Sequence, residues 1–249
     1  MPRFAANLTT LWPEISFLDR FAAARRAGFA GVEVLFPYDV AAGSIVDRLA
    51  GNDLELVLIN APPPNYVGRS RGFAATTGGS DLFRKDFLRA LRHGKVLGAK
   101  AMHVMAGVEG DRDTFVANLA WAAAEAKGRQ ITIEPINRED MPGYFLSDFA
   151  LAREIVAEVG APNLGLQFDA YHAQKITGNL LETWEECRTL VRHVQVAGVP
   201  GRHEPAGGDV DWPAFFARMD ADGYRGWVAG EYRPKGRTED GLGWMAGGR

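Results

Sequence analysis

The sequence predicts an α/β protein whose single domain is a (β/α)8 (TIM) barrel, and three observations support this fold class. The chain has 249 residues, and a barrel of this kind takes about 250. Short apolar runs alternate with longer segments of helical periodicity, which is the pattern of parallel strands joined by helices. The candidate strands number eight, and eight strands close the barrel.

The candidate strands are short and almost continuously apolar, as expected for a sheet that is covered on both faces. They span, in chain order, Arg3–Asn7, Gly31–Val34, Glu55–Ile59, Ala101–Met105, Gln130–Glu134, Leu164–Asp169, His193–Val196 and Trp227–Gly230. No linker, low-complexity tract or internal repeat divides them. We therefore expect one domain over residues 1–249.

The segments between these strands carry helix signals. Ser16 and Asp19 resemble a capping box that opens a helix over Ser16–Ala27. Further helices are predicted over Asp81–Leu97, over Thr114–Lys127, over Asp148–Val159 with Ser147 as its cap, and around Phe215–Asp220 behind Asp211 as its cap. The order of strand and helix therefore repeats along most of the chain.

Two segments fit this repeat less well. The stretch Asn60–Ser80 is too long for a plain connection and is predicted to be a lid or substrate loop. The tail Lys235–Arg249 is rich in glycine and makes a poor eighth helix. An open, doubly wound sheet is the alternative, but no Gly-x-Gly-x-x-Gly motif follows the first strand to favour it.

Composition narrows the function classes. A net charge of −3 with dispersed Lys and Arg argues against a nucleic-acid partner. Cys187 is the single cysteine, which excludes an intrachain disulfide and a cysteine-rich zinc site and fits a reducing cytoplasm. No stretch approaches the roughly 20 apolar residues of a membrane span. We expect a cytoplasmic protein that acts on a small molecule, with homo-oligomerisation left open.

Polar side chains stand at the ends of the last four candidate strands. Glu134 and Asp169 end their strands, Gln195 lies within the next, and Glu231 follows the last. Because the carboxyl ends of parallel barrel strands open on one face, these side chains are expected to converge. Three close carboxylates repel one another unless some are protonated or a cation lies between them. An all-oxygen set of this kind suits one divalent cation, Mg²⁺ or Mn²⁺.

Other polar residues are candidates for binding substrate at the same face. His172 follows Asp169 by three residues, and Arg202 belongs to the loop after the seventh strand, where its guanidinium could clamp a carboxylate with two hydrogen bonds. Weaker candidates, since isolated polar residues at strand ends and in loops are common, are Asn7, Glu33, Asn60, His103, Arg69 and Arg71.

Four ordered segments resemble the motifs of the hydroxypyruvate isomerase family, whose barrel is of the xylose-isomerase type. They are EPINREDMPGYFL (134–146), QFDAYHAQ (167–174), HVQVAGVPGRHEP (193–205) and GYRGWVAGEYRP (223–234), and segments 103–107 and 241–244 also match. The resemblance implies a Mg²⁺ or Mn²⁺ ion held by Glu134, Asp169, Gln195 and Glu231. Related ketose 3-epimerases usually have a histidine where Gln195 stands, so this amide favours the isomerase branch.

The chemistry that the resemblance implies is a proton shift between neighbouring carbons of a small hydroxy-keto acid through an enediolate. Glu134 and Glu231 are expected to act as the acid/base pair, with His172 and Arg202 on substrate oxygens. Hydroxypyruvate, giving tartronate semialdehyde, is the first prediction for the substrate, and a 2-oxotetronate ranks almost level with it. A ketose 3-epimerase, an abasic-site endonuclease and a non-catalytic sugar-binding barrel are less favoured alternatives.

Overall fold

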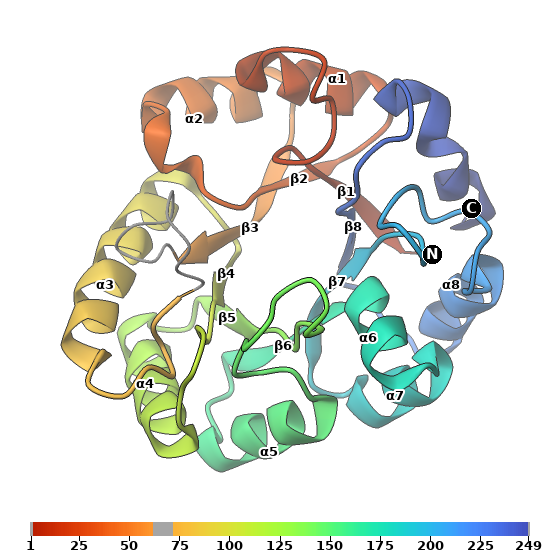
Figure 1. Ribbon diagram of the computed structural model, residues 1–249. Helices are drawn as coiled ribbons and strands as arrows, with labels where there is room; N and C mark the ends of the chain where they lie inside the picture. The colour runs from red at the N-terminus through yellow and green to blue at the C-terminus, as the bar shows by residue number, and fades with distance from the viewer. Residues whose placement is uncertain (1, 62–71, 249) are drawn as a thin grey trace.

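The computed structural model describes residues 2–61 and 72–248 and forms a closed barrel of eight parallel strands (Figure 1). The strands are β1 Arg3–Asn7, β2 Gly31–Val34, β3 Glu55–Ala61, β4 Ala101–Val104, β5 Gln130–Ile133, β6 Leu164–Asp169, β7 Val191–Val196 and β8 Trp227–Gly230. They follow one another around the barrel in chain order, and β1 pairs with β8. The predicted barrel is confirmed, and this closure excludes the open sheet.

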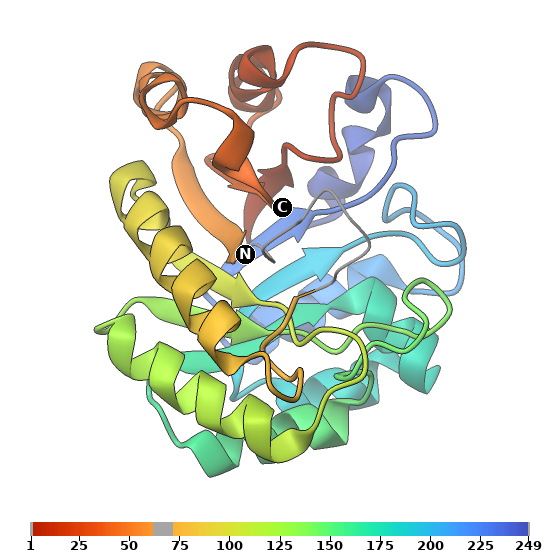
Figure 2. The same ribbon diagram turned by 60° about the vertical axis from the view of Figure 1, so that its left-hand side comes forward.

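Helices form a ring outside the strands (Figure 1), and Figure 2 shows them lying along the outer face of the barrel. The α-helices are α1 Arg20–Arg26, α2 Ala42–Gly51, α3 Ser80–Leu97, α4 Arg112–Glu125, α5 Phe149–Val159, α6 Ala170–Thr177, α7 Leu180–Cys187 and α8 Trp212–Ala221. The 3-10 helices are η1 Phe17–Asp19, η2 Pro37–Asp39 and η3 Thr238–Gly248. After β8, η3 takes the place of an α-helix, as the glycine-rich tail predicted. None of the helices in the described ranges is long and apolar enough to cross a membrane.

Two predicted helix caps are wrong. Ser16 makes no capping bond to the backbone, because its hydroxyl donates to the Asp19 carboxylate 2.6 Å away, and the α-helix begins only at Arg20. Asp148, and not Ser147, caps α5 by accepting the Leu151 N–H at 2.7 Å. In both cases the serine hydroxyl has another partner, Asp19 for Ser16 and Arg138 for Ser147. Only at α5 does a carboxylate, the stronger acceptor, take over as the cap.

The inside of the barrel changes from apolar to polar along the strands. Ala5, Ala101, Trp227 and Ala229 belong to a small apolar cluster that is separate from the main core between strands and helices. Each precedes the polar residue at the end of its strand by two residues or more. Because side chains on a strand alternate between its two faces, the inward series on β8 continues from Trp227 and Ala229 to Glu231. The apolar cluster is therefore the floor beneath a polar mouth at the carboxyl ends of the strands.

The long connection after β3 is described from Gly72 onward. Gly72 forms an isolated bridge with Ala106 after β4, and Asn118 of α4 donates to the Ala74 carbonyl at 2.8 Å. These contacts fix the last part of the connection against α4. Arg69 and Arg71, two of the weaker candidates for substrate binding, lie outside the described residues, so the role of this loop as a lid stays a prediction.

Candidate active site

A cavity of about 590 Å³ opens at the carboxyl ends of the strands. The predicted site residues that line it are Glu134, Glu231, His172, Arg202, His103 and Asn60. Asp169 and Gln195 are buried beside it, and both contact residues of its wall. Asn7 does not line the cavity among the described residues: its amide donates to Glu33 at 2.7 Å, and its Oδ1 accepts the Thr9 N–H.

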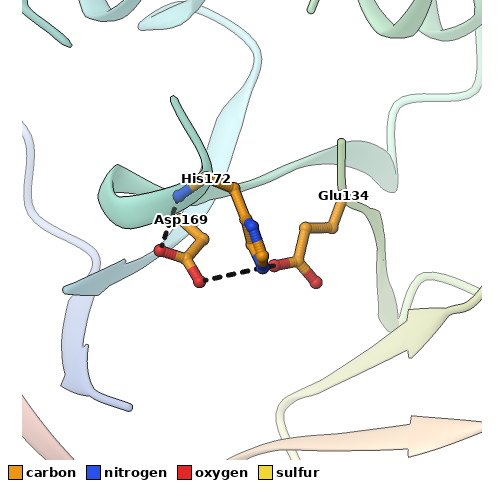
Figure 3. A group of neighbouring side chains, drawn as sticks. All are labelled: Glu134, Asp169 and His172. Atoms are coloured by element: carbon orange, nitrogen blue, oxygen red, sulfur yellow. Dashed lines mark hydrogen bonds and ion pairs between the residues drawn. The ribbon is translucent and has the colours of Figure 1, made fainter. Parts of the chain in front are cut away.

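Glu134, Asp169 and His172 form the tightest group of potential metal ligands in the described part of the chain. One ligand atom of each lies within 4.8 Å of the others, and all three side chains are buried. His172 Nε2 lies 3.8 Å from Glu134 Oε1 and 3.6 Å from Asp169 Oδ2, with the ring between the two carboxylates (Figure 3). Local folding sets this geometry, because Asp169 caps α6 through the Tyr171 N–H and so brings the first turn over the end of β6.

The protonation of His172 follows from its partner Asn137. The Asn137 backbone N–H and side-chain amide face His172 Nδ1 at 3.3 and 2.7 Å, and both are donors. Exchanging the oxygen and nitrogen of the Asn137 amide would break another hydrogen bond, since Asn137 Oδ1 accepts the Asp140 N–H at 2.9 Å. Nδ1 is therefore the acceptor, and Nε2 carries the proton. His172 presents a donor to the cavity, which suits a substrate oxygen better than a metal ion.

Arg202 joins Glu231 to this group. Its Nη2 lies 3.1 Å from Asp169 Oδ2 and 3.3 Å from Glu231 Oε2, and its guanidinium lies over the Tyr171 ring at 5.1 Å. Burial lowers the pKa of Arg202, but the carboxylates of Glu231 and Asp169 outweigh it and hold the pKa above its usual range. A permanently charged guanidinium therefore stands at the predicted place.

Burial and mutual repulsion make the two glutamates poor acids. Burial first, and then the charge of Asp169, raise the pKa of Glu134 well above its usual range. Burial, together with the charges of Glu33 and Asp169, raises the pKa of Glu231 to about 8 in spite of Arg202. A carboxyl with a pKa near neutrality can take and return a proton. A divalent cation among these oxygens would favour their ionised forms.

A buried hydrogen-bond chain supports the site from below. Gln167 Nε2 donates to Glu134 Oε2 at 2.9 Å and to Gln195 Oε1 at 2.8 Å. Gln195 Nε2 in turn donates to Glu33 Oε1 at 2.7 Å, and His193 Nε2 lies 2.6 Å from Glu33 Oε2. Glu33 thus fixes which end of the Gln195 amide faces the site: the oxygen, the atom that a metal ion would need.

Gln167 is a functional candidate that the sequence analysis missed, together with Asp140 and Tyr171 of the cavity wall. A signal existed for Gln167, because it precedes Asp169 by two residues on β6 and so shares its inward face. Asp140 and Tyr171 had none, since their positions depend on how the loop after β5 folds over α6. Tyr171 Oη donates to Asp140 Oδ1 at 3.3 Å.

Metal binding is expected to stabilise the protein more at pH 8 than at pH 6. Raised carboxyl pKa values mean that the folded state holds protons which the unfolded state has released. Without a bound cation, stability should therefore fall as pH rises from 4.5, the ordinary pKa of a glutamic acid, to about 8, the raised pKa of Glu231. A cation that replaces these protons offsets that loss, and at 100 times its Kd it adds about 2.7 kcal/mol, a rise in Tm of roughly 5–10 °C.

Thermal unfolding in EDTA and then in Mn²⁺, from pH 5.5 to 8.5, checks this expectation. Glu231→Gln, which removes one titrating group, should flatten the pH dependence in EDTA. A Tm that Mn²⁺ leaves unchanged at every pH would contradict a metal site among these carboxylates.

Comparison with known proteins shows the family to which the barrel belongs. The model of the family described as "Xylose isomerase-like TIM barrel" matches residues 21–247. A 2-oxo-tetronate isomerase of Cupriavidus necator is 46% identical over 98% of both chains. The hydroxypyruvate isomerase of Escherichia coli is 37% identical, again over 98% of both.

Among solved structures, a protein of Brucella melitensis described as an AP endonuclease of family 2 superposes with a TM-score of 0.95. It is 42% identical, and the match covers 99% of this chain and 98% of that one. The similarity extends through every strand that contributes to the cavity.

Proposed function

Because this chain belongs to the xylose isomerase-like TIM barrel family, we propose that it is a metal-dependent isomerase of a small hydroxy-keto acid. Its preferred substrate in this proposal is 2-oxo-tetronate. The observation that carries this proposal is the pair of buried glutamates, Glu134 and Glu231, that line one cavity with Arg202. The sequence analysis ranked hydroxypyruvate first. The higher identity to a 2-oxo-tetronate isomerase, 46% against 37%, supports the four-carbon acid instead.

The reaction moves one proton between neighbouring carbons. One glutamate, as a carboxylate, takes the proton from C3; the electron pair of that bond forms the C2–C3 double bond, and O2 gains the negative charge. A proton is then returned to C2 by a glutamic acid, and the proton of the C3 hydroxyl passes to O2. The product is the 3-oxo isomer, so atoms and electrons balance without any redox partner. Either glutamate can start, because both have raised pKa values.

The buried donor set fits one divalent cation. Glu134, Asp169, Gln195 and Glu231 would hold it: three are carboxylates, and Glu33 orients the amide oxygen of the fourth. When bound, such an ion acidifies the C3–H bond and stabilises the negative charge that develops on the substrate oxygens.

The remaining polar residues would orient the acid. Arg202 would bind the C1 carboxylate with two parallel hydrogen bonds, which a guanidinium is shaped to form. His172 would donate from Nε2 to an oxygen at C2 or C3, since its Nδ1 is held by Asn137. Tyr171 keeps the guanidinium in place through its ring.

Hydroxypyruvate is the second candidate substrate, because it carries the same carboxylate, carbonyl and neighbouring hydroxyl and lacks only the fourth carbon. Ketose epimerisation is less well supported, since a ketose has no carboxylate for Arg202. The solved ketose 3-epimerases and the keto-glucoside epimerase that resemble this chain are 15–21% identical, so they indicate the fold alone. Nucleic-acid cleavage fits poorly with a net charge of −3 and with a ligand group that contains one histidine in the described residues.

Proton exchange in D₂O tests the proposal directly. Purified protein stripped with EDTA and reloaded with Mn²⁺ or Mg²⁺ should incorporate deuterium at C3 of recovered 2-oxo-tetronate and at C2 of its 3-oxo isomer. Hydroxypyruvate should exchange more slowly at the corresponding carbons. The same protein left in EDTA should lose almost all of this exchange, because no cation is then present to acidify the C–H bond. Exchange that persists in EDTA, or that occurs with ketoses and with neither acid, would contradict the proposal.

A further inference from the structure

Two buried polar side chains on the β3–β4 side of the cavity have atoms without a hydrogen-bond partner in the described residues. They are Oδ1 of Asn60 and both ring nitrogens of His103. Asn60 is 5% exposed and His103 is 1% exposed. A buried polar atom without a partner is destabilising, so most proteins avoid leaving three of them together.

Both side chains face the cavity from neighbouring strands. Asn60 and His103 are paired in the register of β3 and β4, and both line the wall of the cavity. His103 Nδ1 lies 3.4 Å from Glu134 Oε2, which places the imidazole beside one member of the proton-transfer pair. The unpartnered atoms therefore lie next to the place where the substrate reacts.

The strand order places this pair across the barrel from Arg202. Arg202 follows β7, and β3 is four strands away from β7 in the closed ring of eight. A substrate whose carboxylate is held by Arg202 and whose C2 and C3 lie between Glu134 and Glu231 extends its far end toward β3 and β4. In a four-carbon acid that end is the C4 hydroxymethyl group.

We propose that Asn60 and His103 form a subsite that binds the C4 hydroxyl and so distinguishes the four-carbon acid from the three-carbon one. A hydroxyl both donates and accepts. It can donate to Asn60 Oδ1 and accept from the protonated nitrogen of a neutral imidazole. This inference rests on the proposed function and adds to it the residues that select the substrate.

These hydrogen bonds would make the site prefer the four-carbon acid to the three-carbon acid. The four-carbon acid satisfies the buried atoms, whereas hydroxypyruvate, which has no C4, leaves them to water or to nothing. Sites built to hydrogen-bond a substrate hydroxyl reject the analogue that lacks it more strongly than apolar pockets reject a missing methylene. We expect the wild-type kcat/KM for 2-oxo-tetronate to exceed that for hydroxypyruvate by about 10–100-fold, the worth of one or two such hydrogen bonds.

Substitutions of similar shape test the subsite. Asn60→Leu and His103→Phe, assayed with saturating Mn²⁺, should lower kcat/KM for 2-oxo-tetronate by about 10–100-fold and change that for hydroxypyruvate less than about 3-fold. Damage to the fold or to Glu134 would lower both values together, so the ratio separates recognition from structure. Erythronate and glycerate are unreactive acids with and without the C4 hydroxymethyl group. In calorimetry the wild type should bind erythronate more tightly than glycerate, and the two variants should lose this preference.

Trp212→Phe is the matched control. Trp212 is buried and its Nε1 also lacks a hydrogen-bond partner in the described residues, but it lies on α8 and does not line the cavity. It should leave the substrate ratio unchanged. If the wild type is active but the Asn60 and His103 variants lose both activities equally, or lose neither, the subsite alone is overturned. A wild type inert with both acids would overturn the proposed function and the subsite with it.

Discussion

Glu134→Gln and Glu231→Gln are each expected to lower kcat for 2-oxo-tetronate by about 10²–10⁴-fold, the usual contribution of a positioned acid or base. Glutamine keeps an oxygen at nearly the same place but cannot take a proton from carbon. Because both residues belong to one proton-transfer pair, the kcat of the double variant should be only slightly lower than that of the less active single variant. Strong non-additivity of this kind marks residues that act as a unit.

The loss has to be separated from a loss of metal, because both glutamates are also proposed ligands. Mn²⁺ affinity measured by calorimetry, with kcat taken at saturating Mn²⁺, makes this separation. Glu182→Gln, an exposed carboxylate on α7, is the control and should retain wild-type kcat. Either active-site variant turning over at the wild-type rate would contradict an acid/base role for that residue.

Arg202→Gln is expected to lower kcat/KM for the acid substrates by roughly 100–1,000-fold. Two hydrogen bonds to a charged carboxylate are lost, each worth about 1.5–2 kcal/mol, and the effect should fall mainly on KM. Arg202→Lys should recover only part of it, since an ammonium group cannot form the paired contact.

A substrate without a carboxylate provides the control for Arg202. Deuterium exchange into dihydroxyacetone, slow as it is expected to be, should fall little in Arg202→Gln. Because Arg202 also lies 3.1 Å from Asp169 and 3.3 Å from Glu231, Mn²⁺ binding should be no weaker in this variant. Equal losses with the acid and with the neutral compound would contradict a carboxylate clamp and indicate a role in holding the carboxylates.

The sequence predicted the barrel well because its strands carry an unambiguous signal. Apolar runs such as Leu164–Asp169 and Trp227–Gly230 end at residues that the structure confirms. Three helices were missed for physical reasons. Glycines at both ends weaken the helical signal of α2, and α6 begins directly after its strand because Asp169 is both the strand end and the helix cap. α7 follows so closely on α6 that the pair resembles one irregular connection.

The site was predicted in part. Glu134, Glu231, His172, Arg202 and His103 line one cavity, as residues at the carboxyl ends of parallel strands should. Contacts between strands far apart in the sequence could not be predicted, among them the hydrogen bond from Gln195 on β7 to Glu33 on β2. No local pattern in either segment specifies that pairing, since it depends on closure of the barrel.

The bond between Gln195 and Glu33 also bears on how this enzyme could evolve. Exchange of Gln195 for histidine, the residue that the family resemblance leads us to expect in ketose 3-epimerases, would remove the amide that donates to Glu33 and accepts from Gln167. A mutant altered at this one position would carry a buried carboxylate with one donor fewer, and compensating changes on β2 or β6 would have to arrive with it. The two branches should therefore be separated by epistasis, and a laboratory selection for epimerase activity should recover substitutions at Glu33 or Gln167 alongside any change at Gln195.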